Sequence, residues 1–60
     1  MQLPKDPNML LSVVNTKLRD EYPSLSELSK AYGAEKNDIE ESLGALGFVY
    51  DESLNRFIAK

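Results

Sequence analysis

The amino-acid sequence predicts a mainly α fold, in which three helices pack around one core and a β-hairpin closes the C-terminal end. Three observations support this prediction. Apolar residues recur at helical spacing in three segments, helix-starting and helix-ending residues separate these segments, and two short apolar and aromatic runs follow residue 47. We expect a single domain over residues 1–60, with helices over 7–21, 24–32 and 35–46 and a hairpin over 48–59.

The helix predicted over residues 7–21 begins after Asp6, whose side chain suits the cap, and Pro7 fits the first helical position. Pro23 disfavours helical backbone at the residue before it and ends the helix. The apolar residues of this helix lie on more than one of its faces, so its apolar surface is larger than two other helices and a hairpin would obviously bury. These residues are Met9, Leu10, Leu11, Val13 and Val14. We expect part of this surface to be covered in a homodimer, which would also enlarge a small core.

The helix predicted over residues 24–32 begins with a capping box, in which the Ser24 side chain accepts a hydrogen bond from the backbone of Glu27. Gly33 suits the left-handed conformation that commonly follows a helix end. The predicted buried side of this helix carries Leu25, Leu28, Ala31 and Tyr32.

The helix predicted over residues 35–46 carries acidic residues near its start, where they complement the positive end of the helix. Gly44 lies inside it and weakens it by about 1 kcal/mol relative to alanine. Either Gly44 faces a close neighbour or the fold tolerates the loss, and Gly47 ends the helix. The side chains expected to point inward are Ile39, Leu43 and Leu46.

The C-terminal segment predicts a hairpin with strands over residues 48–50 and 56–59 and a loop over 51–55. An isolated hairpin is marginally stable in water, so this one must pack against the helices. The residues expected to make that contact are Phe48, Tyr50 and Phe57.

Residues 25–47 resemble a helix-turn-helix unit, and the helix before them and the hairpin after them complete an outline similar to a winged-helix domain. The resemblance is carried by Leu28, Gly33, Ala34, Ile39 and Leu43, and Ser29 stands where such units usually place alanine. It implies a DNA-binding transcriptional regulator, with residues 35–46 as the reading helix and the hairpin as the wing.

The charges of that reading helix oppose a nucleic-acid partner. Its exposed positions carry four carboxylates, Glu35, Asp38, Glu40 and Glu41, against one lysine, Lys36. The whole chain has seven Lys and Arg against ten Asp and Glu, a net charge of -3. Carboxylates near phosphate add repulsion where DNA-binding proteins gain affinity, so we do not expect nucleic acid to be the partner.

Two polar residues one helical turn apart, Asn15 and Arg19, interrupt the helix predicted over residues 7–21. One interpretation is a structural network that holds the hairpin or caps a helix end. The other is a partner contact. The candidate partner surface therefore consists of Glu35, Asp38, Glu40, Glu41, Asn15 and Arg19.

The composition argues against catalysis, because the chain has no histidine and no cysteine, and its serines have no evident base. We expect no cofactor, no metal ion and no small-molecule substrate. The N-terminal residues lack the features of a signal peptide, and no apolar run approaches the length of a membrane span. Together with the absence of cysteine, this favours the cytoplasm.

The whole chain also resembles a family of short uncharacterised bacterial proteins of about sixty residues, defined only as a domain of unknown function. The most specific similarity lies in residues 3–7, in 14–15 together with 18–20, and in 55–57. The resemblance implies an intact small protein and no particular activity. Our leading hypothesis is a non-catalytic module that acts through protein contacts, either by self-association or by binding a larger partner. A recruitment domain whose acidic third helix engages a basic protein is a further class that the sequence does not separate from this one. The alternative is a DNA-binding winged-helix regulator.

Overall fold

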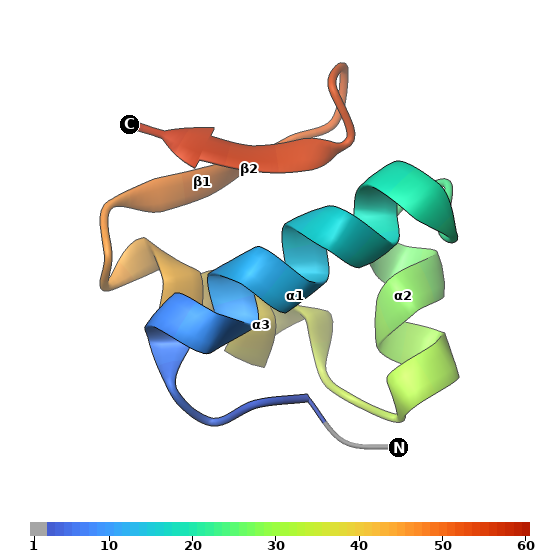
Figure 1. Cartoon of the computed structure of the whole chain (residues 1–60), viewed down its shortest axis with the longest axis horizontal. Helices are drawn as coiled ribbons and strands as arrows, with labels where there is room; N and C mark the ends of the chain where they lie inside the picture. Colours follow the sequence, from blue (N-terminus) through green and yellow to red (C-terminus); the bar gives the residue numbers. More distant parts are fainter. Residues whose placement is uncertain (1–2) are drawn as a thin grey trace.

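The computed structural model describes residues 3–60 and consists of three helices followed by an antiparallel hairpin (Figure 1). The elements are α1 (Pro7–Asp20), α2 (Leu25–Tyr32), α3 (Lys36–Gly44), β1 (Phe48–Asp51) and β2 (Arg56–Ala59). This order confirms the predicted fold class, a helix-turn-helix arrangement of three helices with a C-terminal hairpin.

α1 begins as predicted, because the Asp6 carboxylate accepts a hydrogen bond of 3.0 Å from the backbone N–H of Asn8 and Pro7 is the first helical residue. It ends at Asp20, one residue before the predicted end. Glu21 leaves the helical region with φ of -127°, two residues ahead of Pro23.

α2 is bounded by the predicted caps. The Ser24 hydroxyl accepts a hydrogen bond of 3.2 Å from the backbone N–H of Glu27, and Gly33 has a left-handed φ of 65°. Ser24 itself has extended backbone, so the helix starts one residue later than predicted. The prediction that Ala31 is buried is wrong: although it follows Leu28 by three residues, it lies at the edge of the helix face formed by Leu25, Leu28, Ser29 and Tyr32, and it is exposed. Ser29 is buried and donates a hydrogen bond of 2.8 Å to the backbone oxygen of Leu25.

α3 is shorter at both ends than the predicted range of 35–46. Glu35 is the extended residue before the helix, and after Gly44 the chain tightens into a turn in which the N–H of Gly47 donates to the oxygen of Gly44 at 2.9 Å. Gly47 then has a left-handed φ of 86°. A Cβ atom added at Gly44 would meet no atom within 4 Å, so no close neighbour requires this glycine.

Because the space around Gly44 is empty, replacing it by alanine should stabilise the protein. We expect the Gly44→Ala variant to gain about 0.5–1 kcal/mol in the free energy of unfolding, mainly because alanine has less backbone freedom in the unfolded chain. Urea unfolding followed by circular dichroism measures the change. A loss of stability would show that a side chain is not tolerated there.

In the hairpin, Val49 pairs with Ile58 and Tyr50 pairs with Phe57. β1 continues one residue beyond the predicted end, because Asp51 still pairs with Arg56. The loop over residues 52–55 is stabilised by the Asp51 carboxylate, which accepts a hydrogen bond of 3.3 Å from the N–H of Leu54.

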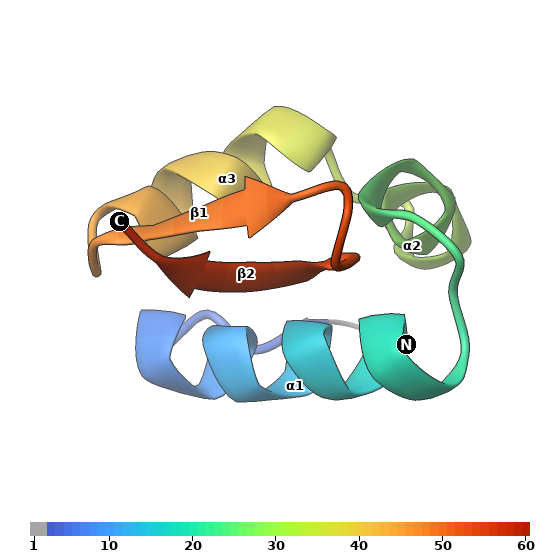
Figure 2. The same ribbon diagram turned by 90° about the horizontal axis from the view of Figure 1, so that it is seen from above.

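The hairpin lies across the helices, with β2 alongside α1 and β1 alongside α3 (Figure 2). The core between them holds eight buried apolar residues: Leu10, Val14, Leu18, Leu25, Leu28, Ile39, Leu43 and Phe57. Leu11 packs against this core, so the apolar surplus predicted for the first helix is largely covered, and Met9 remains 59% exposed. Within residues 3–60, none of the helices combines the length and apolar character that crossing a membrane requires.

Candidate functional site

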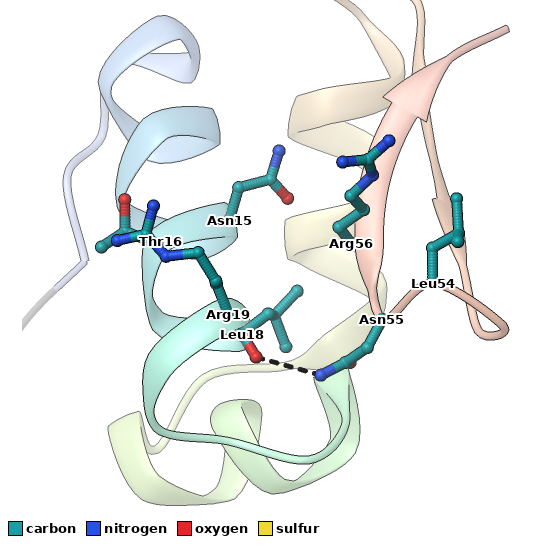
Figure 3. Close-up of a pocket in the computed structure, with 7 residues that line it drawn as sticks. All are labelled: Asn15, Thr16, Leu18, Arg19, Leu54, Asn55 and Arg56. Carbon is teal, nitrogen blue, oxygen red and sulfur yellow. Dashed lines mark hydrogen bonds between the residues drawn. The ribbon is translucent and has the colours of Figure 1, made fainter.

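A groove of about 510 Å³ separates the C-terminal half of α1 from the hairpin loop and the start of β2 (Figure 3). We call it the α1–hairpin groove. Its walls combine amide, guanidinium and aliphatic groups, so it offers hydrogen bonds and positive charge to a ligand. It is lined by Asn15, Thr16, Leu18, Arg19, Leu54, Asn55 and Arg56.

Asn15 closes the outer edge of β2. Its Oδ1 accepts a hydrogen bond of 2.8 Å from the N–H of Phe57, and its Nδ2 donates one of 3.2 Å to the oxygen of the same residue. A side-chain amide offers the same donor and acceptor as a peptide group, so Asn15 replaces the neighbouring strand that β2 lacks on this side. The structural interpretation of Asn15 is therefore supported by its contacts.

Asn55 connects the hairpin loop to the end of α1. Its Nδ2 donates a hydrogen bond of 3.1 Å to the backbone oxygen of Leu18 (Figure 3) and one of 2.9 Å to that of Tyr22. The backbone of Asn55 has a left-handed φ of 52°. The last carbonyl groups of a helix have no partner inside the helix. Asn55 therefore supplies from the other end of the chain the cap that α1 needs.

Tyr50 extends this network to the start of α2. Its hydroxyl donates a hydrogen bond of 2.7 Å to Oδ1 of Asn55 and accepts one of 3.2 Å from the backbone N–H of Leu25. The hairpin thereby satisfies backbone groups on both sides of the α1–α2 connection. We call these contacts of Asn55 and Tyr50 the corner network.

Arg19 lies at the rim of the α1–hairpin groove and is 73% exposed. Its guanidinium donates two hydrogen bonds, of 2.8 and 2.9 Å, to the carboxylate of Asp20. These bonds raise the pKa of Arg19 and lower the pKa of Asp20. Because both groups face solvent, the pair adds little stability, and Arg19 stays accessible to a partner.

A second surface is formed by the exposed side chains of Glu35, Asp38, Glu40 and Glu41, on α3 and the residue before it. We call it the acidic surface. In the part of the chain that the structure describes, the two ion pairs are Lys17–Glu21 and Arg19–Asp20, and neither includes a member of this surface. Its negative charge is therefore left for solvent or a partner.

The six residues predicted as a partner surface thus lie in two places. Asn15 and Arg19 line the α1–hairpin groove, whereas the acidic surface lies with α3, on the other side of the hairpin from α1 (Figure 2). The sequence did not indicate Asn55 and Tyr50 as members of a polar network. Asparagine commonly bonds backbone groups, which could have pointed to Asn55, but the backbone oxygen of Tyr22 that it binds is 33 residues away in the sequence.

The described residues offer hydrogen bonding and charge recognition. Among residues 3–60, no three histidine, cysteine, aspartate or glutamate side chains gather in a way that could hold a metal ion. The helices and the hairpin leave charged and amide groups at the surface, where they can form ion pairs and hydrogen bonds.

The fold and these surfaces define a small three-helix domain with a C-terminal hairpin that secures its own helix ends. The chain belongs to the family described as the domain of unknown function DUF4250, whose model matches residues 4–57. No curated protein and no solved structure matches the chain.

Proposed function

We propose that this protein is a non-catalytic module of the cytoplasm that acts by binding another protein through its acidic surface. The observation that carries the proposal is the group of four exposed carboxylates without an ion-pair partner among the described residues. Like charges this close in sequence on one helix repel one another. A positively charged partner relieves that repulsion and gains affinity and association rate from it.

The partner that fits is a lysine- or arginine-rich protein segment. Asp38 and Glu41 are three residues apart, so their side chains are neighbours on the helix surface. Glu35 and Glu40 add charge on either side of them, which gives a broad negative surface along α3. Such a surface favours recognition of several cations along a segment over binding of one small molecule.

The alternative is the DNA-binding regulator implied by the helix-turn-helix resemblance, and the observed order of three helices and a hairpin favours it. Its reading helix would be α3, whose carboxylates would then face phosphate groups. We therefore expect no binding of mixed-sequence duplex DNA at low salt, where non-specific association is strongest. A shift that disappears as salt is added would favour the DNA-binding alternative.

Neutralising the acidic surface should weaken binding of a fluorescently labelled lysine-rich peptide. We expect the variant Glu35→Gln, Glu40→Gln, Glu41→Gln to raise the dissociation constant at low salt by about tenfold or more, because local attraction is lost. Fluorescence anisotropy measures it. The matched control, Glu21→Gln, Glu27→Gln, Glu52→Gln, removes the same charge from three other exposed glutamates and should change it by about threefold or less. Equal losses in both variants would assign the binding to net charge and refute the proposal.

A further inference from the structure

The hairpin has two outer edges, and only the edge of β2 is bound by a side chain from another element. On β2, the N–H and C=O of Phe57 point away from β1 and are bound by Asn15. In an antiparallel ladder, residues that point outward on one strand lie opposite residues that point outward on the other. The backbone groups of Tyr50, which pairs with Phe57, therefore point away from β2 at the free edge of β1.

Phe48 has the same orientation as Tyr50, because backbone direction repeats every second residue along a strand. The bond of 2.9 Å from the N–H of Lys60 to the oxygen of Gly47 confirms this alternation, since Gly47 points inward to the ladder. The N–H and C=O groups of Phe48 and Tyr50 have no hydrogen-bond partner among residues 3–60. β1 thus has two donors and two acceptors on its outer edge that no other residue in the range 3–60 binds by hydrogen bond.

We propose that a second copy of this chain pairs with β1 through its own β1, in antiparallel orientation, to form a four-stranded sheet across a two-fold axis. This inference does not depend on the acidic surface. The edge is self-complementary: Phe48 of one copy exchanges two hydrogen bonds with Tyr50 of the other, and the symmetric pair gives two more. All four open backbone groups on each copy are satisfied in this register.

Val49 supports the choice of a second copy as the occupant. It lies on the outer face of the hairpin, is 42% exposed, and in this register stands directly opposite Val49 of the second copy. This central pair does not exchange hydrogen bonds, and side chains approach most closely in such pairs. Asp51 stands opposite Gly47 of the second copy, so no carboxylate in β1 faces its own copy directly.

The proposed interface between the two copies is short, because β1 has four residues. Interfaces far below the standard size form weak, transient complexes, so we expect a dimer with a dissociation constant on the order of 0.1 mM. It contains no ion pair in β1. Its dissociation constant should therefore not rise with added NaCl, whereas binding through the acidic surface should weaken, and this difference separates the two proposals.

The first test is sedimentation and amide hydrogen exchange over a concentration series. In wild type, the exchange of Phe48 and Tyr50 N–H should slow as concentration rises, while Val49, already in the ladder, serves as the internal control. Val49→Lys should raise the dissociation constant by about tenfold or more, because two lysines would then face each other. Leu54→Lys, at a loop residue that is 55% exposed, should leave it unchanged. A strict monomer at millimolar concentration would overturn the proposal.

The second test fixes the register and does not require the lysine variant to fold. The chain has no cysteine, so Val49→Cys and Leu54→Cys each introduce a single thiol. With oxidised glutathione as the oxidant, the Val49→Cys chain should form a disulfide-linked dimer at least tenfold faster than the Leu54→Cys chain, because paired strands place the two Cα atoms within bridging distance. Equal rates would show that β1 does not pair in this register and would reject the proposal.

Discussion

Replacing Asn55 by alanine is expected to lower the free energy of unfolding by about 3 kcal/mol. The substitution removes the bonds from Nδ2 to the oxygens of Leu18 and Tyr22 and the bond that Oδ1 accepts from Tyr50. Each such bond contributes about 0.5–1.5 kcal/mol. Alanine also tolerates the left-handed backbone of residue 55 poorly, which costs about 1 kcal/mol more. Urea unfolding measures the loss.

Two further variants separate the causes of this loss. Asn55→Gly loses the same hydrogen bonds but keeps an unstrained left-handed backbone, so it should be about 1 kcal/mol more stable than Asn55→Ala. Ser53→Ala, at an exposed position of the same loop, should change stability by less than about 0.5 kcal/mol. If the free energy of unfolding of Asn55→Ala lies within about 1 kcal/mol of the wild-type value, the corner network does not stabilise the fold in solution.

The second large effect is expected for Asn15→Ala, which should lower the free energy of unfolding by about 2 kcal/mol. It leaves the N–H and C=O of Phe57 without the partners that bind them at 2.8 and 3.2 Å. Alanine's better helix propensity offsets part of the loss, by about 0.5 kcal/mol. Faster exchange of the Phe57 N–H, measured by nuclear magnetic resonance, should accompany the loss.

Thr16→Ala is the matched control for Asn15→Ala. Thr16 is the next residue of α1 and is exposed, so its replacement changes helix propensity without removing a bond to β2. We expect it to be neutral or stabilising by about 0.5 kcal/mol. An Asn15→Ala chain as stable as the Thr16→Ala chain would mean that water satisfies the edge of β2 equally well.

Local rules predicted the helix starts to within one residue, because the causes of a helix start lie within a few residues of it. Asp6 accepts a hydrogen bond from the residue two positions later, and Ser24 accepts one from the residue three positions later. Gly33 ends its helix through its own left-handed backbone. The exposure of the carboxylates on α3 followed in the same way from helical spacing. These features depend on sequence neighbours, which a sequence displays directly.

The polar contacts of the hairpin could not be predicted in this way. Asn15 and Phe57 are 42 residues apart, and which side of α1 faces β2 depends on how the helices and hairpin pack together. From the sequence, Asn15 belonged either to a structural network or to a partner contact, and the sequence did not decide between the two. Ala31 and Ser29 show a different kind of error: the apolar Ala31 was assigned to the buried side of its helix but is exposed, whereas the polar Ser29 is buried with its hydroxyl bonded to the backbone oxygen of Leu25.

The corner network also bears on how the chain acquires its structure during synthesis. Asn55 bonds the backbone at the end of α1, and Tyr50 bonds the N–H of Leu25 at the start of α2; both residues are translated after the two helices. A growing chain that has reached Gly33 therefore contains the residues of both helices and the Ser24 cap, but not these later bonds. We expect the ends of α1 and α2 to become fully stable only when Tyr50 and Asn55 are present, so that the helices and the hairpin fold as one unit.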